Sequence, residues 1–217
     1  YYTNEEITIP LDPTQTPGEN AQRYFAKYNK QKRTFEALTE LIQETADDIQ
    51  YLESISNALD IALSEADLAQ IKEELMQSGY VRRKHTKKKV KLTSKPMHYI
   101  SSDGYDMYVG KNNLQNEELT FSFANGNDWW FHAKGAPGSH VIVKSGGDEL
   151  PDRTFEEAGR LAAYYSKNRG SDKVEIDYIQ KKHVKKPNGA KPGFVVYYTN
   201  YSLVIDSDIS NIKNVQD

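Results

Sequence analysis

The chain has 217 residues, of which 37% are hydrophobic, and a formal net charge of −3. It contains no cysteine, which excludes disulfide bonds and thiolate metal sites. No apolar run approaches the roughly 18 residues of a membrane span, so we expect a folded, soluble chain without contact to a membrane. Because it begins with Tyr1 rather than methionine, we expect a fragment of a longer protein.

The charges are unevenly divided along the chain. Residues 1–80 carry 6 Lys and Arg against 15 Asp and Glu, a net charge of −9, whereas residues 81–217 carry 22 against 16, a net charge of +6. The change falls at residues 82–91, which contain seven Lys or Arg. We therefore expect two modules joined by a basic linker over 81–96, which is either a solvated spacer or a tether for a polyanion.

Residues 1–80 predict a helical arm that begins with a long helix. Thr16, Pro17 and Glu19 match a capping box with proline at the first helical position, so this helix is expected over about 17–62. Apolar residues recur every seven positions, which is typical of a left-handed coiled coil. The two seam positions hold Ala21, Tyr28, Phe35, Ile42, Ile49 and Ser56, and Tyr24, Gln31, Leu38, Thr45, Leu52 and Leu59.

A second, shorter helix is expected to run back antiparallel to the first. Ser64 and Asp67 favour its start and Gly79 its end, which places it over about 64–78. Because it is short, the seam from Tyr24 to Phe35 needs another partner. We expect either a second copy in a homodimer or a preceding region of the parent protein; the alternative is that the arm is only a spacer.

Residues 97–217 predict a compact α+β domain. An Asp-Gly pair at 103–104 between two strand-like runs is typical of a hairpin, and residues 112–124 favour a helix over a strand. Thr154 and Glu157 match a capping box for a further helix. One well-formed helix against a mainly antiparallel sheet leaves one sheet face free for a partner. Strands are expected at 98–101, 105–109, 129–133, 140–144, 173–184, 194–199 and 202–206.

The densest group of chemistry-bearing side chains lies in residues 128–140, here called the first motif. Gly135, Pro137 and Gly138 shape a loop that lets a ligand approach the backbone. Since neighbouring side chains of a strand point to opposite faces, at most one of Trp129 and Trp130 is expected to stack on a ligand. The candidate binding residues of this motif are Asp128, Trp130, His132, Lys134, Ser139 and His140.

Two chemical interpretations of the first motif are weak. Asp128, Ser139 and the two histidines are the residue types of a Ser-His-Asp triad, but no nucleophile elbow surrounds the serine, so we expect no enzyme. A carboxylate with His132 and His140 suffices for zinc, but no tightly spaced histidine pair or cysteine accompanies them. We expect neither a metal nor a cofactor.

A third interpretation is nucleic-acid binding, which draws on a second basic segment, residues 181–193, here called the second motif. Lysines of both motifs would contact phosphates, and one aromatic ring would stack on unpaired RNA bases. The alternative is that both motifs are only tight turns in a lysine-rich surface. The candidate binding residues of this motif are Lys181, Lys182, His183, Lys185, Lys186 and Lys191, with Gly189 and Gly193 permitting close backbone approach.

Both motifs, together with Val109–Asn113, Gln115–Glu117 and the helix at 162–167, closely resemble the NFACT-R domain. The likeness covers nearly the whole chain in order, from the start of the coiled coil at Glu19–Gln22, and the sequence is identified as a member of the NFACT family. Bacterial members are the most similar, including the anchorless streptococcal fibronectin-binding proteins. Within this resemblance one signature consists of Asp128, Trp130, His132, Pro137, Gly138, Ser139 and His140, and the other of Lys185, Lys186, Gly189, Lys191 and Gly193.

The resemblance implies binding rather than catalysis. It implies a cytoplasmic RNA-binding and ribosome-binding module of a quality-control factor that recruits tRNA to obstructed large ribosomal subunits for alanine tailing of stalled nascent chains. The helical arm would then reach across the subunit while the basic domain contacts tRNA or ribosomal RNA. The runner-up is a surface adhesin module that binds host fibronectin, exported without an anchor or signal peptide.

Overall fold

The computed structural model describes residues 5–82 and 94–215, so most of the expected basic linker lies outside the described residues. The chain forms two compact units, Tyr1–Ile49 and Gln50–Asp217. This division comes earlier than the boundary expected at residue 80, because the second helix packs with the sheet domain. No helix of the described ranges is long and apolar enough to cross a membrane.

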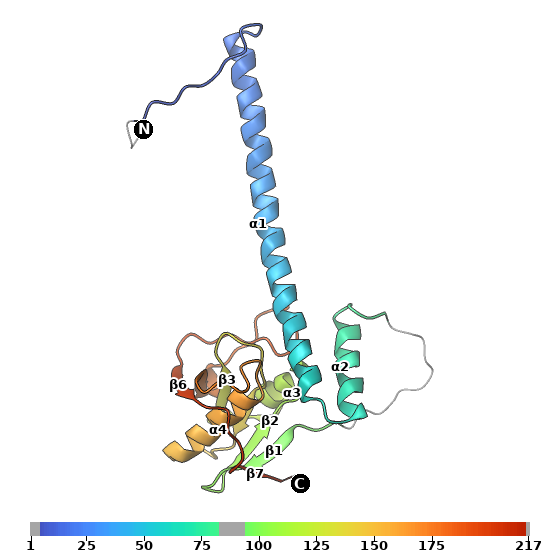
Figure 1. Cartoon of the computed structure of the whole chain (residues 1–217), viewed down its shortest axis with the longest axis vertical. Coiled ribbons are helices and arrows are strands. Elements are labelled where there is room, and N and C mark those ends of the chain that lie inside the picture. The colour runs from blue at the N-terminus through green and yellow to red at the C-terminus, as the bar shows by residue number, and fades with distance from the viewer. Residues whose placement is uncertain (1–4, 83–93, 216–217) are drawn as a thin grey trace. The chain divides into compact units, whose positions relative to one another are not determined.

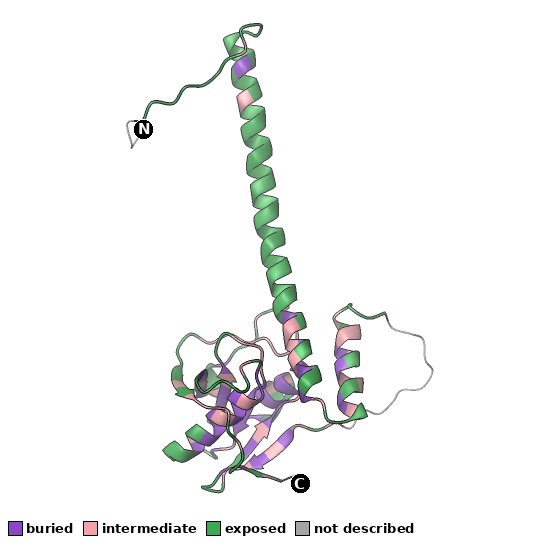
Figure 2. Cartoon of the chain, in the orientation of Figure 1, coloured by how far each residue is buried: buried purple, intermediate pink, exposed green. Residues whose placement is uncertain are grey.

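One uninterrupted helix, α1, spans Pro17–Ile61 (Figure 1). The expected capping box is confirmed: the Thr16 amide donates to Glu19 Oε2 at 2.7 Å, and the Glu19 amide donates to Thr16 Oγ1 at 3.3 Å. In the first unit the apolar seam is exposed; Phe35, for example, is 72% exposed (Figure 2). Among the described residues of this unit no second helix covers the seam, so its expected partner stays a prediction.

The second helix, α2, spans Glu65–Gln77 and packs on the C-terminal end of α1 within the second unit. The buried residues that they share are Tyr51, Ile55, Ala58 and Ile71. Ser64 and Asp67 form the capping box at its start, and Gly79 adopts a φ of 83° just after its end. The antiparallel helix pair therefore exists, but it is part of the domain that carries the sheet.

Seven antiparallel strands form one sheet, in the order β6-β5-β3-β4-β2-β1-β7. Their bounds are β1 Met97–Ile100, β2 Asp106–Val109, β3 Trp129–Ala133, β4 Val141–Val143, β5 Val174–Gln180, β6 Tyr201–Ile205 and β7 Lys213–Asn214. The expected hairpin at 103–104 joins β1 to β2. Helix α4, Asp152–Tyr164, covers one sheet face with its buried residues (Figure 1). The α+β fold is confirmed.

The opposite sheet face is also covered, so the expectation of a free face was wrong. Residues 112–124 form helix α3, Asn113–Glu118, which continues into a π-helical turn, η1, at Leu119–Phe123. Leu119 joins Trp130 and Ile142 in a second buried cluster on this face. The short turn η2, Lys181–His183, follows β5 and leads to Val184, which completes that cluster. The central strands β3 and β4 are thus enclosed on both sides.

The predicted capping box of α4 was wrong. Pro151 is the N-cap of α4, and no side chain caps the helix. Thr154 Oγ1 donates to Asp103 Oδ2 at 2.8 Å, and Glu157 Oε2 accepts from the Ser102 amide at 2.7 Å. Both side chains fasten the helix to the β1–β2 turn instead, a long-range pairing that the local pattern does not contain.

The strand expected at 194–199 is not formed, so the last two expected strands do not pair with each other. Strand β6 pairs with β5, not with the segment that precedes it. That segment makes a single bridge, in which the amides and carbonyls of Lys185 and Val196 exchange hydrogen bonds of 2.9 and 2.8 Å. The pairing closes the second motif into a loop beside α3.

Candidate nucleic-acid interface

A pocket of about 210 Å³ lies where the two motifs meet α3. The first motif contributes His132, His140 and the loop between them, and the second motif contributes its last residue, Gly193. Asn113 and Asn116 of α3 complete the pocket on a further side. Two segments that lie far apart in the sequence are therefore brought together, as the expectation of one shared surface required.

The two imidazoles of this pocket are uncharged at neutral pH. His132 and His140 meet edge to face, with ring centroids 5.4 Å apart. Burial lowers the pKa of His132 to about 4, although a hydrogen bond with the Gly138 backbone acts in the opposite direction. Burial and then the neighbouring His132 lower the pKa of His140 well below its usual value. Neither histidine is thus a cation for phosphate; each offers hydrogen bonds.

Of the two adjacent tryptophans, Trp130 is the buried one. Its ring centroid lies 5.6 Å from that of His132, 5.1 Å from His140 and 5.2 Å from Tyr197. Its indole N–H has no hydrogen-bond partner among the described residues. Trp129 points to the other sheet face, where it is partly exposed and packs on Phe155 with a centroid separation of 4.9 Å. A stacking role for the Trp130 ring is therefore confined to the pocket.

Asp128 and Ser139, which we expected to bind RNA, are buried. Asp128 Oδ2 lies 2.5 Å from the ammonium of Lys144 and accepts from the Asn125 amide at 2.7 Å. The Ser139 hydroxyl donates to the Gly110 carbonyl at 2.5 Å. These contacts hold the motif in place, and nothing exposes either group to a phosphate.

The side chains of the weighed triad and metal site do not assemble. His140 Nδ1 pairs with Thr120 Oγ1 at 2.8 Å, while Ser139 bonds to backbone. Among the residues that the structure describes, no group of three or more His, Cys, Asp and Glu is placed to hold a metal ion.

Most cationic side chains of the second motif lie at the surface. The exposed ones are Lys182, His183, Lys185 and Lys186, while Lys181 and Lys191 are partly buried. Lys186 pairs with Glu117 at 2.7 Å. Lys191 Nζ lies 4.5 Å from the ring centroid of Tyr51 and donates to the Tyr80 hydroxyl at 2.9 Å.

Glycines of the second motif have specific geometric tasks. Gly189 and Gly193 adopt φ angles of 74° and 81°, in the left-handed region that disfavours other residues. A Cβ at Gly193 would lie 2.9 Å from Asn113 Cβ, so this backbone must pass α3 closely. The Gly193 amide also donates to Glu117 Oε2 at 3.3 Å. The end of the motif is thus fixed against the pocket.

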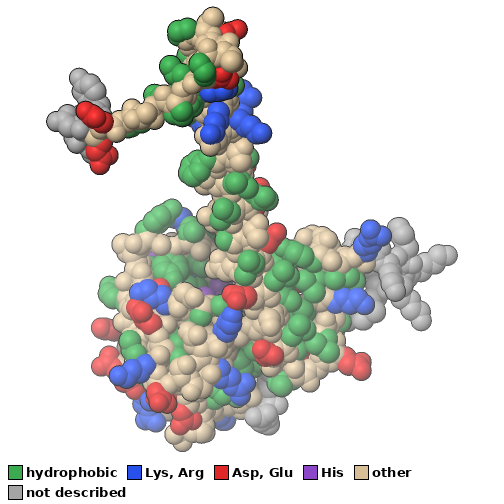
Figure 3. Space-filling model, turned by 45° about the horizontal axis from the view of Figure 1, so that its top comes forward, with side chains coloured by type: hydrophobic (Ala, Val, Ile, Leu, Met, Phe, Trp, Pro, Cys, Tyr) green, Lys and Arg blue, Asp and Glu red, His purple; other side chains and the backbone are tan. Residues whose placement is uncertain are grey.

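Cations of the first motif are partly neutralised. Lys134 Nζ lies 2.5 Å from Glu175 Oε1, and both side chains are about half exposed. Gly135 next to it has a φ of 62°, and a Cβ at Gly138 would lie 3.0 Å from Ser166 Cβ. On the face of the molecule in Figure 3, basic and acidic side chains are interspersed. Of the two motifs, the second therefore offers more exposed cations to a polyanion.

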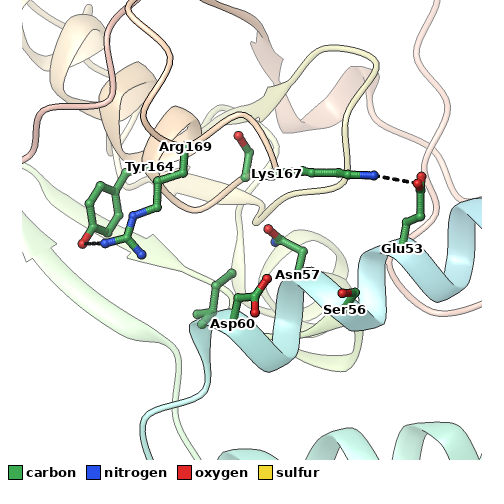
Figure 4. Close-up of a pocket in the computed structure, with 9 residues that line it drawn as sticks. Glu53, Ser56, Asn57, Asp60, Tyr164, Lys167 and Arg169 are labelled. Carbon is green, nitrogen blue, oxygen red and sulfur yellow. Dashed lines mark hydrogen bonds and ion pairs between the residues drawn. The ribbon is translucent and has the colours of Figure 1, made fainter.

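A second pocket, of about 390 Å³, lies between the C-terminal end of α1 and the segment after α4 (Figure 4). Its two cations are already engaged: Lys167 pairs with Glu53 at 2.6 Å, and Arg169 lies 3.8 Å from the Tyr164 ring centroid. Asp60 adds a negative charge. This pocket is a poorer anion site than the surface of the second motif.

Asn116 and Glu117 join the two motifs, a role that the sequence did not predict for these residues. Asn116 Oδ1 accepts from the His140 amide at 2.9 Å, and its Nδ2 donates to the Gly138 carbonyl at 3.3 Å. Glu117 holds both Lys186 and Gly193. The feature of the sequence that could have indicated them is the run of Asn and Gln side chains at the start of α3, where Asn113, Gln115 and Asn116 are buried. Buried amides require partners, which here are the motifs.

Two family models together match most of the chain. The family model for the NFACT N-terminal and middle domains matches residues 1–94, and the model for the NFACT protein RNA binding domain matches residues 95–199. The Rqc2 homolog RqcH of Streptococcus pneumoniae strain R6 is 46% identical over the whole chain, and that of Bacillus subtilis strain 168 is 42% identical over 98% of it. The chain spans 39% and 38% of the lengths of these relatives.

A solved structure is similar as well. It is the C-terminal region of the fibronectin/fibrinogen-binding protein from Streptococcus suis, at 44% sequence identity and a TM-score of 0.81. The match covers 91% of this chain and 79% of that one.

Proposed function

This chain belongs to the NFACT family, and on that premise we propose that it is a non-enzymatic RNA-binding and ribosome-binding part of a ribosome quality-control factor. Its sheet domain matches the family's RNA-binding domain, and the relatives named RqcH support the quality-control role. For the whole protein we propose recruitment of tRNA to obstructed large ribosomal subunits, followed by C-terminal alanine tailing. Such a role places the protein in the cytoplasm.

The observation that carries this proposal is that lysines of the second motif are exposed, whereas most polar side chains of the first motif are buried. Lys182, Lys185 and Lys186 are exposed, and the segment that carries them ends at Gly193, which lines the pocket. Lysine ammonium groups at a surface attract phosphates, and each contact releases counterions from the nucleic acid. RNA affinity should therefore depend steeply on salt.

A salt titration tests the proposal. Binding of this chain to single-stranded RNA, to tRNA and to large ribosomal subunits is measured between 50 and 300 mM KCl. With Lys185→Gln and Lys186→Gln together, the slope of log affinity against log salt should fall by about 1.4, since each phosphate contact contributes about 0.7 on single strands. The matched control changes Lys173 and Lys213, exposed lysines at other strand ends, to Gln and should leave the slope unchanged.

Two outcomes would overturn the proposal. One is an RNA affinity that is absent at all salt concentrations while the chain is folded. The other is tight binding to fibronectin with no affinity for RNA, which would favour the fibronectin-binding role after which the Streptococcus suis relative is named.

For the first unit we propose that its apolar seam is covered in the working protein by a second copy or by another region of the parent chain. Tyr28, Phe35 and Ile42 are 58%, 72% and 68% exposed, and a seam of this kind pairs with another helix. Sedimentation should show self-association of this chain that Phe35→Ser weakens. A monomer at all concentrations would leave only the other region as the partner.

A further inference from the structure

We propose that the pocket between the two motifs takes one unpaired nucleobase of an RNA strand, as an uncharged planar ring, while the lysines of the second motif hold the phosphates of the same strand. The inference rests on the proposed RNA binding and specifies its ligand. It assigns base binding to the pocket and phosphate binding to the lysines, whereas a lysine-rich surface alone would bind only the phosphates.

The size and charge of the pocket favour a single ring system. Its volume of about 210 Å³ is below the roughly 300–1,000 Å³ of pockets for drug-sized ligands. None of the described side chains that line it is a Lys, Arg, Asp or Glu. Both imidazoles are neutral near pH 7, since the pKa of His132 is about 4 and that of His140 is also lowered. A phosphate buried there would have no counter-charge, which is costly.

An unpaired donor in the wall indicates what the ring must carry. Trp130 lines the pocket and is buried, yet its indole N–H has no partner among the described residues. A buried donor without a partner costs about 1–3 kcal/mol. Because this N–H is closed off from solvent in the structure, a carbonyl oxygen or ring nitrogen at the edge of a base accepts its hydrogen bond once the Trp130 ring shifts toward the pocket, and every nucleobase offers such an acceptor.

Aromatic side chains supply faces for the ring. Phe194 and Tyr197 line the pocket and are partly exposed, and the Tyr197 ring lies 5.2 Å from that of Trp130 between centroids. The Tyr197 hydroxyl donates to Asp177 Oδ2 at 2.8 Å, which fixes the ring. Stacking of a base on an aromatic side chain contributes about 1–3 kcal/mol and needs no particular base.

The chain connects these walls directly to the cations. Lys191 lies two residues before Gly193, and Lys134 directly precedes Gly135, and both glycines line the pocket. Lys185 is bridged to Val196, the neighbour of Tyr197. A strand that crosses the second motif on its phosphates therefore passes the pocket, and one of its bases can turn inward.

An abasic series tests the inference on the 217-residue chain. Single-stranded RNA 10-mers that lack one base at a time, with the ribose and phosphate kept, are compared with the complete 10-mer by fluorescence polarisation. A hairpin added at the 5′ end of each 10-mer fixes where the single strand lies on the protein. Loss of the base at one position should then weaken binding by about 10-fold, and loss at any other position by less than threefold. In Trp129→Phe, Trp130 is the only tryptophan, and its emission should change with the complete 10-mer but not with the sensitive abasic one.

A pair of neighbouring substitutions tests the same point from the protein side. Val195→Trp fills the pocket and should abolish the sensitivity to the missing base, with binding to the abasic RNA unchanged. Val196→Trp at the next position, which does not line the pocket, should keep the sensitivity. If Val195→Trp does not fold, as judged by circular dichroism, the abasic series with Trp130 emission decides alone.

The outcomes separate the two levels of the proposal. Equal affinity for complete and abasic RNA at every position, with a steep salt dependence, would overturn the base pocket and leave RNA binding in place. Competition by inorganic phosphate for the Trp130 emission change would also overturn it. Absence of RNA binding altogether would instead overturn the proposed function on which it rests.

Discussion

The two motifs look alike as sequence, since each packs donors, glycines and a proline into thirteen residues, but the structure uses them in opposite ways. The first motif turns Asp128, Trp130, Ser139 and His140 inward, whereas the second leaves Lys182, Lys185 and Lys186 outside. The first builds most of the pocket, and the second presents charge at the surface and reaches the pocket at Gly193. The density of reactive residue types in a motif therefore does not indicate how many of its side chains can contact a ligand.

The location of each motif in the sheet explains the contrast. The first motif begins on β3 and ends at β4, which lie at the centre of a sheet that is covered on both faces. The second follows β5 and crosses the outside of the domain through η2. Polar groups in the first position must be satisfied by protein, while those in the second are satisfied by water.

The largest expected effect comes from truncating the interior ring of the first motif. Trp130→Ala should lower the free energy of unfolding by about 3–5 kcal/mol, because a large buried side chain is replaced by a cavity. Urea denaturation followed by circular dichroism measures it. Trp130→Phe, which keeps a ring and removes the unpaired N–H, should cost much less. A loss below about 1 kcal/mol for Trp130→Ala would show that the buried first motif does not stabilise the fold more than the exposed second motif does.

Acidification should act through the first motif as well. The pKa of His132 is about 4 in the folded chain against 6.5 when free, so the unfolded state takes up the proton first as the pH falls. Stability is therefore fully present above about pH 6.5 and declines between 6.5 and 4, by up to about 1.4 kcal/mol per pH unit for this group.

Urea denaturation at several pH values between 4.5 and 7.5 measures this decline. His132→Gln should make the decline shallower, since one of the two buried imidazoles is gone, while His140, whose pKa burial also lowers, still contributes. His183→Gln, at the exposed histidine of the second motif, is the matched control and should leave the slope as it is. Equal slopes in all three chains would show that burial of His132 does not govern the pH response.

Within the second motif, the two glycines should differ. Gly193→Ala combines a φ of 81° with a Cβ that would lie 2.9 Å from Asn113, and it should cost about 2 kcal/mol. Gly189→Ala has a φ of 74° but open space around it, and it should cost about 1 kcal/mol. Thermal unfolding compares them. Equal costs would mean that the motif is not pressed against α3.

The smallest effect on stability is expected from the lysines that we propose to hold RNA. Lys185→Gln together with Lys186→Gln should change the free energy of unfolding by less than about 1 kcal/mol, because the pair of Lys186 with Glu117 is partly exposed. The same urea titration measures it beside the RNA assay. A loss above about 2 kcal/mol would show that these lysines stabilise the fold. A change in RNA binding could then no longer be attributed to lost phosphate contacts.

Local signals in the sequence predicted the local parts of the structure. The capping residues Thr16 and Ser64 mark helix starts because a cap involves only the next turn. The Asp-Gly pair at 103–104 marks its hairpin for the same reason. These features, with strand alternation, suffice for the α+β fold.

The parts of the fold that the sequence did not predict depend on contacts between residues that lie far apart in the chain. Thr154 and Glu157 have the spacing of a cap but bond to the β1–β2 turn. Strand alternation predicts that Trp129 and Trp130 face opposite ways, yet it does not say which face is more deeply covered. That depended on α3, η1 and Val184 closing over one side. The same closure formed the pocket, so its asparagine wall was not predicted.

The π-helical turn η1 has room for a change of length. A π turn holds one more residue than the α-helical turn it replaces, so deletion of the exposed Ser122 would convert η1 into an α-helical turn and leave the following chain in nearly the same direction. Leu119, which packs with Trp130, and Thr120, which pairs with His140 Nδ1, precede this deletion and are expected to keep their contacts. Deletion of Thr120 itself would instead remove the side-chain partner of His140.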